Sequence, residues 1–219
     1  MNNAQRRNDK PTPSESLSMN REPRLSTGEA ELRHYVVAIT GASGAPYARR
    51  LLQCFKSPEE QIHLVASKAG KMVYRLETGV SLHEDLPAGT MMYDEDDFAA
   101  PFASGSFPIE GMVVVPCTMG SLAAIAQGYS RNLIHRAADV CLKERRRLVV
   151  VPREMPLNRI HLSNMLQVVE AGGIILPPMP GFYHQPQSVA DLVDFVVARI
   201  LTHLGLAQDL VSPWLGTYE

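Results

Sequence analysis

Short runs of aliphatic and β-branched residues recur along the chain, and they alternate with longer segments whose apolar residues have helical spacing. Continuous apolar runs of this length are typical of strands that are buried on both faces of a parallel sheet. The predicted strands are 35–39, 62–66, 112–115, 148–151 and 173–176. The predicted helices are 46–55, 67–78, 121–127, 136–146, 159–171 and 188–204. This alternation predicts the α/β class: a doubly wound, mostly parallel sheet in a Rossmann-like or flavodoxin-like three-layer sandwich.

Two regions depart from this alternation. Residues 1–33 are rich in Asn, Arg, Pro, Ser and Glu and hold few apolar residues, so burial cannot offset the entropy lost on ordering. We interpret them as a disordered polar tail, and a start at Met19 is compatible with the same composition. Residues 81–107 are interpreted as an irregular excursion. The remaining chain, 34–219, is long enough for one good hydrophobic core, which predicts a single domain.

Composition and charge exclude several classes of function. The 219 residues are 45% hydrophobic and carry a formal net charge of −2, so no global basic field favours nucleic acid or an anionic membrane. No apolar run reaches the roughly 20 residues that span a bilayer, and the amino terminus lacks the apolar stretch of a signal peptide. The cysteines, Cys54, Cys117 and Cys141, are too sparse for a disulfide framework, which favours a reducing compartment. We therefore expect a cytoplasmic protein without a membrane or nucleic-acid partner.

Four of the predicted strands end in small, hydroxyl-bearing or charged residues. These ends are Gly41–Gly44, Ser67, Thr118–Ser121 and Arg153–Glu154. Because the carboxyl ends of parallel strands meet at one sheet edge, where open α/β sheets bind ligands, the four ends should lie together. Each also has a plain structural interpretation, a tight turn for the glycines and a helix N-cap for the hydroxyls. In combination they favour a phosphorylated planar ligand such as FMN.

The fourth of these ends combines opposite charges on a stiff turn. Arg153 and Glu154 stand between Pro152 and Pro156, which deny the turn helical continuation. A guanidinium and a carboxylate held there offer both anion recognition and proton transfer. Cys117, which ends another strand, is interpreted as a buried core residue, since no histidine partner for a nucleophile is identifiable.

A group of charged residues lies on the predicted helix 136–146. Helical spacing puts Arg136, Asp139 and Lys143 on one face. Asp139 could pair with either cation, or the cations could form a wall that binds a second phosphate. The arginines that follow, 145–147, are interpreted in part as solvated cations at the helix end, where they suit the helix macrodipole.

Several segments, taken in order, resemble the UbiX-type flavin prenyltransferases, from about residue 35 to the carboxyl terminus. The matching segments are T-G-A-S-G-A (40–45), S-K-A (67–69), A-S-G-S-F (103–107), V-P-C-T-M-G-S-L-A (115–123), R-A-A-D-V-C-L-K-E-R-R (136–146), V-P-R-E-M-P-L (151–157) and P-G-F-Y-H-Q-P-Q-S (180–188). The resemblance implies that 34–219 is a flavin-binding domain. It implies an enzyme that joins a dimethylallyl group from dimethylallyl monophosphate to reduced FMN without a metal. The product, prenylated FMN, is the cofactor of UbiD-type decarboxylases.

The resemblance also assigns roles to individual residues. The FMN-binding residues are expected to be Gly41, Ala42, Ser43, Ser67, Thr118, Met119, Gly120, Ser121 and Arg153. The substrate-binding residues are expected to be Arg136, Lys143, Tyr183, Arg199 and Trp214, and the catalytic residues Glu154, Lys143, Tyr183 and Glu77. Arg136 resembles a residue that the family lends across a subunit boundary, so a homo-oligomer is expected, with a dodecamer as the predicted state. Met155 stands where the family commonly has a smaller residue.

Two other functions remain as alternatives. One is a flavin-dependent cysteine decarboxylase of the same superfold, such as those acting on phosphopantothenoylcysteine. Its substrate-recognition motif, P-x-M-N-x-x-M, is missing from this sequence. The other is a carrier that only binds and delivers FMN. A carrier needs no second anion site, whereas this chain retains Lys143, Tyr183 and Arg199.

Overall fold

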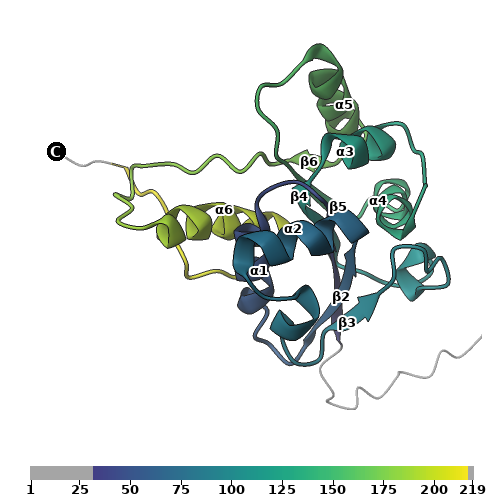
Figure 1. Cartoon of the computed structure of the whole chain (residues 1–219), viewed down its shortest axis with the longest axis horizontal. Helices are drawn as coiled ribbons and strands as arrows, with labels where there is room; N and C mark the ends of the chain where they lie inside the picture. The colour runs from purple at the N-terminus through teal and green to yellow at the C-terminus, as the bar shows by residue number, and fades with distance from the viewer. Residues whose placement is uncertain (1–31, 217–219) are drawn as a thin grey trace, which may run out of the picture. The chain divides into compact units, whose positions relative to one another are not determined.

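Six parallel strands form one sheet in the order β3-β2-β1-β4-β5-β6 in the computed structural model, which describes residues 32–216 (Figure 1). The strands are β1 (Arg33–Ile39), β2 (Glu60–Ala66), β3 (Met91–Tyr93), β4 (Gly111–Cys117), β5 (Arg147–Pro152) and β6 (Ile174–Ile175). The chain runs outward from β1 to β3, then crosses back to β4 beside β1 and continues to β6. The reversal between β1 and β4 is the switch point at which sheets of this kind bind ligands. The predicted fold class is confirmed.

Helices cover both faces of the sheet. They are α1 (Ala45–Cys54), α2 (Lys68–Thr78), α3 (Met119–Ala126), α4 (Leu133–Lys143), α5 (Arg159–Glu170) and α6 (Val189–Leu204), with short 3₁₀ segments η1 (Leu82–Asp85) and η2 (Pro101–Ala103). Apolar residues of α1, α2 and α6 pack on one face, and those of α3, α4, α5 and η2 pack on the other (Figure 1). Within residues 32–216, no helix has the length and apolar character needed to cross a membrane.

The central strand shows why the apolar runs are continuous. In β1, Val37 and Ile39 belong to the core beneath α1 and α6, whereas Val36 and Ala38 belong to the core beneath α4. All four side chains are at most 1% exposed. A strand with helices on both sides buries alternate residues in opposite cores, so no polar face remains in its sequence.

Three details differ from the sequence prediction. β1 begins at Arg33, which lies within the range assigned to the tail, and its side chain pairs with Glu60 at 3.0 Å. The excursion 81–107 contains β3, whose three residues are too short a run to be recognised. The helix predicted over 136–146 runs instead over Leu133–Lys143.

The arginines that follow α4 also differ from the sequence interpretation. Arg145 adopts φ +57° and leaves the helix. Arg146 is not a solvated cation at a helix end, because it donates to the carbonyls of Phe107 and Gly105 at 2.7 and 2.6 Å. The described residues, 32–216, belong to one compact unit, and the remaining part of the predicted tail lies outside them.

Candidate active site

The loops that follow β1 and β4 are joined by Thr40 at the carboxyl edge of the sheet. Its hydroxyl donates to the Pro116 carbonyl at 2.8 Å and accepts from the Thr118 amide at 2.8 Å. A Cβ at Gly41 would lie 2.6 Å from the Cβ of Ala69, so only glycine lets this loop pack against the start of α2. The loops after β1, β2 and β4 therefore meet at one edge, as the sequence predicted.

The carboxylate of Glu77 lies at the amino terminus of α1. Its Oε2 atom accepts hydrogen bonds from the amides of Gly44 and Ala45 at 2.9 and 2.8 Å. Burial tends to raise the pKa of Glu77, but hydrogen bonds from Ser43 and these amides, with the nearby charge of Arg153, outweigh it and lower the pKa. Two amides of the predicted phosphate-binding turn are thus satisfied by the protein's own carboxylate, and Glu77 is brought to the site edge from the last turn of α2.

The hydroxyls at the other two strand ends act as helix caps. Ser67 accepts from the Gly70 amide at 3.0 Å, and Thr118 accepts from the Ser121 amide at 3.1 Å. The Thr118 hydroxyl donates to the Ser121 hydroxyl at 3.0 Å. These contacts orient the first turns of α2 and α3 and aim their remaining N–H groups at the sheet edge, where an anion would be stabilised.

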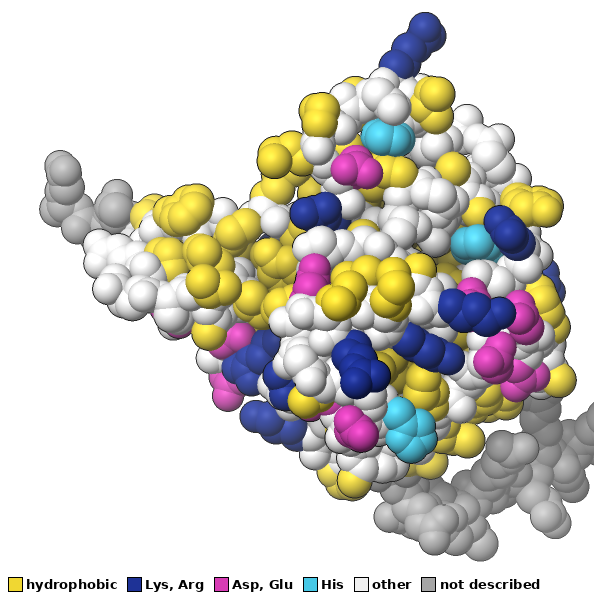
Figure 2. Space-filling model, in the orientation of Figure 1, with side chains coloured by type: hydrophobic (Ala, Val, Ile, Leu, Met, Phe, Trp, Pro, Cys, Tyr) yellow, Lys and Arg dark blue, Asp and Glu magenta, His cyan; other side chains and the backbone are white. Residues whose placement is uncertain are grey.

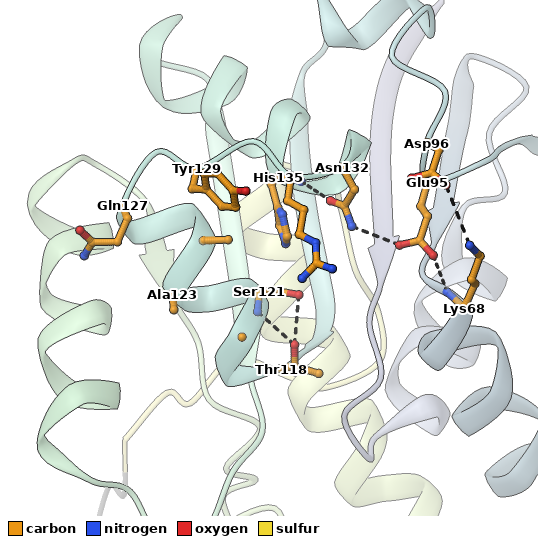
Figure 3. A pocket seen from close by; sticks show the side chains of 13 residues that line it. Lys68, Glu95, Asp96, Thr118, Ser121, Ala123, Gln127, Tyr129, Asn132 and His135 are labelled. Carbon is orange, nitrogen blue, oxygen red and sulfur yellow. Dashed lines mark hydrogen bonds and ion pairs between the residues drawn. The ribbon is translucent and has the colours of Figure 1, made fainter.

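A cavity of about 790 Å³ opens beside these caps (Figure 3). Thr118 and Ser121 line one side of it, and Lys68 and Glu95 line another. Glu95 accepts from the Lys68 amide at 2.8 Å and from the Asn132 side chain at 3.1 Å, which ties the end of β3 to the starts of α2 and α4. The sequence pattern did not indicate this side of the cavity. Glu95 lies in the segment interpreted as irregular, and Asn132 caps a helix that starts earlier than predicted.

His135 also lines the cavity, and its side chain lacks hydrogen-bond partners. The residue is 7% exposed, and neither ring nitrogen has a partner among the described residues. Burial, reinforced by the charge of Arg131, lowers its pKa, so the ring is neutral near pH 7. A buried neutral imidazole without a partner is a group that a bound ligand or water could satisfy.

Arg153 and Glu154 follow β5 at the same edge. The Arg153 amide donates to the Cys117 carbonyl at 3.1 Å, which fixes the turn beside the end of β4. Both side chains are exposed, and Glu154 Oε1 accepts from the Met155 amide at 3.0 Å. The Cys117 thiol is fully buried, and burial raises its pKa to about 12, which excludes it as a nucleophile. Met155 is 88% exposed, and nothing in the structure explains its presence.

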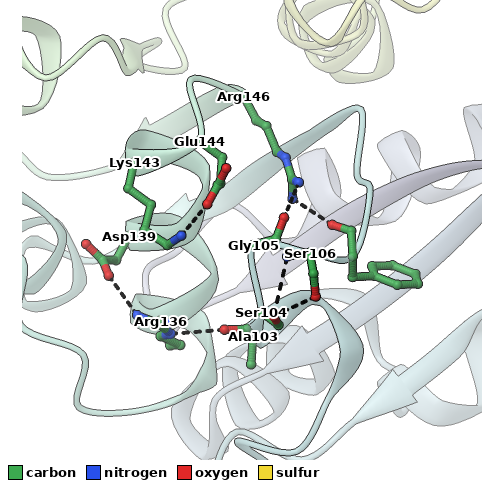
Figure 4. Close-up of polar contacts among 10 residues, drawn as sticks. Ala103, Ser104, Gly105, Ser106, Arg136, Asp139, Lys143, Glu144 and Arg146 are labelled. Atoms are coloured by element: carbon green, nitrogen blue, oxygen red, sulfur yellow. Dashed lines mark hydrogen bonds and ion pairs between the residues drawn. The ribbon is translucent and has the colours of Figure 1, made fainter. Parts of the chain in front are cut away.

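Arg136 and Lys143 belong to a second group of residues, on α4 (Figure 4). Arg136 pairs with Asp139 at 3.0 Å, which is the intrahelical pair expected from their spacing. Lys143 pairs with Glu144 instead. Lys143 ends α4 just before β5 begins, whereas Arg153 follows the last residue of β5. Lys143 therefore lies at the amino-terminal end of the strands and Arg153 at their carboxyl end. A single chain does not bring the two cations together.

Tyr183 and Trp214 form a third group with α6. The centroids of these two rings lie 5.1 Å apart, and the Tyr183 centroid lies 5.7 Å from that of Phe195. Arg199, one helical turn beyond Phe195, is exposed. Hydrophobic side chains gather over this region in Figure 2, and Tyr183 and Trp214 are 52% and 59% exposed. Exposed aromatic groups that gather in this way are typical of surfaces that bind another molecule.

A doubly wound parallel sheet with helix amino termini and hydroxyls gathered at its carboxyl edge is suited to a phosphorylated ligand. The family model described as Flavoprotein matches residues 23–201, so the chain is a flavoprotein. The chain is 50% identical over 192 residues to the flavin prenyltransferase UbiX of Pseudomonas aeruginosa, an alignment that covers 81% of this chain and 92% of the relative. The chain belongs to the flavin prenyltransferase UbiX family.

Solved structures support the same assignment. One is AnUbiX (PadA1) in complex with FMN and dimethylallyl pyrophosphate, with a TM-score of 0.82, 43% identity, and coverage of 86% of this chain and 100% of that one. Another is a dodecameric FMN-dependent UbiX-like decarboxylase from Escherichia coli O157:H7, with a TM-score of 0.80 and 46% identity. It matches 84% of this chain and 100% of its own.

Proposed function

We propose that this protein joins a dimethylallyl group from dimethylallyl monophosphate to reduced FMN and releases prenylated FMN. The observation that carries the proposal is the family membership, combined with the ligand-binding groups gathered at the carboxyl edge. The alternatives are weaker. A carrier needs no second set of cations, and a cysteine decarboxylase is not what the similar curated relatives are.

The carboxyl edge suits FMN in its chemistry. The close packing at Gly41, the capped starts of α2 and α3, and the unpartnered His135 beside the cavity are features that a phosphorylated ligand would use. In the proposal FMN is held by Gly41, Ala42, Ser43, Ser67, Thr118, Met119, Gly120, Ser121 and Arg153. The flavin, when bound, supplies the nucleophilic nitrogen and carbon that accept the dimethylallyl group.

The other predicted residues have roles that follow from allylic chemistry. Breaking the carbon–oxygen bond of an allylic phosphate leaves a phosphate anion, which Lys143, Arg199 and the Tyr183 hydroxyl would stabilise by charge-assisted hydrogen bonds. Forming two new bonds to the flavin releases protons, and in the proposal Glu154 accepts one. Trp214 would exclude water from the reacting cation.

These residues require more than one copy of the chain. Lys143 and Arg153 lie at opposite sheet edges, so in the proposal each site combines groups from neighbouring subunits, with Arg136 among those lent. A dodecamer is the proposed assembly, since the Escherichia coli structure is described as one. We further propose a UbiD-type decarboxylase as the recipient of the product. A cytoplasmic location is compatible with the free thiols.

The test is the mass of the flavin after turnover. The protein is incubated anaerobically with reduced FMN and dimethylallyl monophosphate, with the diphosphate in a parallel sample. We expect the released flavin to gain one C5H8 unit, and an unchanged mass with both donors would refute the proposal. Glu154→Gln should still bind FMN but form product at least about a hundredfold more slowly, as for a lost general base. Glu59→Gln, an exposed glutamate on the loop before β2, is the matched control.

A further inference from the structure

The segment Ala103–Phe107 contacts both cations of α4 that the proposed function assigns to the substrate (Figure 4). The Arg136 Nε atom donates to the Ala103 carbonyl at 3.0 Å. A Cβ on Gly105 would lie 2.7 Å from Lys143 Nζ and would overlap the carboxylate of Glu144. The backbone of Gly105 therefore lies against the ammonium, and a side chain at this position would displace the ends of the Lys143 and Glu144 side chains.

The segment is itself held in place by its neighbours. Arg146 donates to the carbonyls of Gly105 and Phe107 at 2.6 and 2.7 Å, and hydrogen bonds from a charged donor are stronger than those between neutral groups. The hydroxyls of Ser104 and Ser106 lie 2.9 Å apart, within hydrogen-bond distance. Phe102, just before the segment, is fully buried. The backbone beside Lys143 is thus held by Arg146 and by a contact within the segment itself.

Glu144 also contacts the Lys143 ammonium. Its carboxylate accepts a hydrogen bond from Lys143, and that bond, with the charges of Lys143 and Arg146, lowers the pKa of Glu144 and keeps it ionised. An ammonium has three N–H donors, so a lysine that gives one to Glu144 keeps two for a phosphate. A free lysine side chain samples many rotamers, and a lysine already oriented loses less entropy when it binds.

We propose that Glu144 and Gly105 are positioning residues that orient the Lys143 ammonium toward the phosphate of the allylic substrate. This inference rests on the proposed function, in which Lys143 binds that phosphate. In this inference the A-S-G-S-F segment acts through Lys143. The role accounts for the glycine beside the ammonium. Backbone carbonyls of the same segment accept hydrogen bonds from Arg136 and Arg146.

The test measures binding without turnover. Dimethylallyl monophosphate is titrated into protein loaded with oxidised FMN, and the Kd is measured by calorimetry for the wild type, Glu144→Gln, Gly105→Ala and the control Glu59→Gln. We expect Glu144→Gln to weaken binding about two- to fivefold, as for loss of one exposed ion pair. Gly105→Ala should weaken it about tenfold, because the ammonium itself must move. The control and the affinity for FMN should be unchanged.

Each change is then repeated in a Lys143→Met background, which separates positioning from general damage to the fold. If Glu144 and Gly105 act through Lys143, neither change should weaken binding further there. Equal effects in both backgrounds, or no effect in the wild-type background, would overturn the inference. If Lys143→Met itself binds normally while the flavin still gains mass, the inference is wrong and prenyl transfer stands. If the wild type neither binds the donor nor changes the flavin mass, the proposed function is wrong.

Discussion

A buried histidine on β2 makes the stability of this protein depend on pH in a way that the structure allows us to calculate. His63 is 2% exposed, its Nε2 atom lies 2.9 Å from His34 Nδ1, and its Nδ1 atom lies 2.9 Å from the Tyr93 hydroxyl. The rings of Phe102 and Phe107 pack against it, with centroids 5.6 and 5.5 Å away. Burial, with a smaller contribution from the charge of His34, lowers the pKa of His63 from 6.5 to about 4.

The direction of the effect follows from proton binding. Between pH 6.5 and about 4 the unfolded chain protonates this histidine and the folded chain does not, so stability is full above pH 6.5 and falls as the pH drops. The whole pKa shift contributes on the order of 3 kcal/mol to the free energy of unfolding above pH 6.5. Of this contribution, about 2 kcal/mol is already lost at pH 5. For a chain of this size that loss lowers Tm by about 4–8 °C.

The assay compares thermal unfolding of the wild type and His63→Gln between pH 7 and pH 5, at one fixed protein concentration because assembly affects Tm. Glutamine keeps a donor and an acceptor but does not titrate in this range. Burial also lowers the pKa of His135, but that residue is present in both proteins and cancels in the difference. Between pH 7 and pH 5 we expect the free energy of unfolding to fall by about 2 kcal/mol more in the wild type than in the variant. Parallel pH profiles would show that the folded protein does not hold His63 neutral.

Two further predictions concern single side chains. Thr118→Val removes the N-cap of α3 and should lower the free energy of unfolding by about 1 kcal/mol in denaturant titrations, whereas Thr118→Ser should restore it; equal stability of the two variants would contradict the cap. Burial raises the pKa values of Cys117 and Cys141 to about 12, so iodoacetamide should label Cys54 first at pH 7.5, as read by peptide mass spectrometry. Labelling of Cys117 in the folded protein at the same rate as Cys54 would contradict its burial.

Strands and helices could be predicted wherever the apolar pattern was long enough. The run Leu148–Val151 is fully buried as expected, because a strand covered by helices on both faces buries its side chains on both sides. β3 could not be predicted, because three residues give too little pattern. Its place is set by tertiary contacts, including the one between the Tyr93 hydroxyl and His63. Contacts of this kind leave no local pattern in the sequence.

In the candidate site, too, some features could be predicted from the sequence and others depend on tertiary contacts. The meeting of loops at the carboxyl edge could be predicted, because it follows from parallel strands alone. The hydrogen bonds from Gly44 and Ala45 to Glu77 could not be predicted, since they join residues about thirty positions apart through the side-by-side packing of α1 and α2. The burial of His135 in the wall of the cavity likewise depends on where α4 starts, which the helical pattern located three residues too late.

The opposite positions of Lys143 and Glu154 lead to a last prediction, about mixed assemblies. α4 ends at Lys143, next to the start of β5, and Glu154 follows the end of β5, so a site that uses both takes them from different subunits. Lys143→Met and Glu154→Gln should each be nearly inactive alone. In an assembly formed by co-expressing the two in equal amounts, about a quarter of the sites receive both native residues, and activity should return to about a quarter of the wild-type value. Native mass spectrometry confirms that the two variants have mixed. A mixed assembly without recovered activity would show that one chain supplies both groups, against the geometry of its sheet.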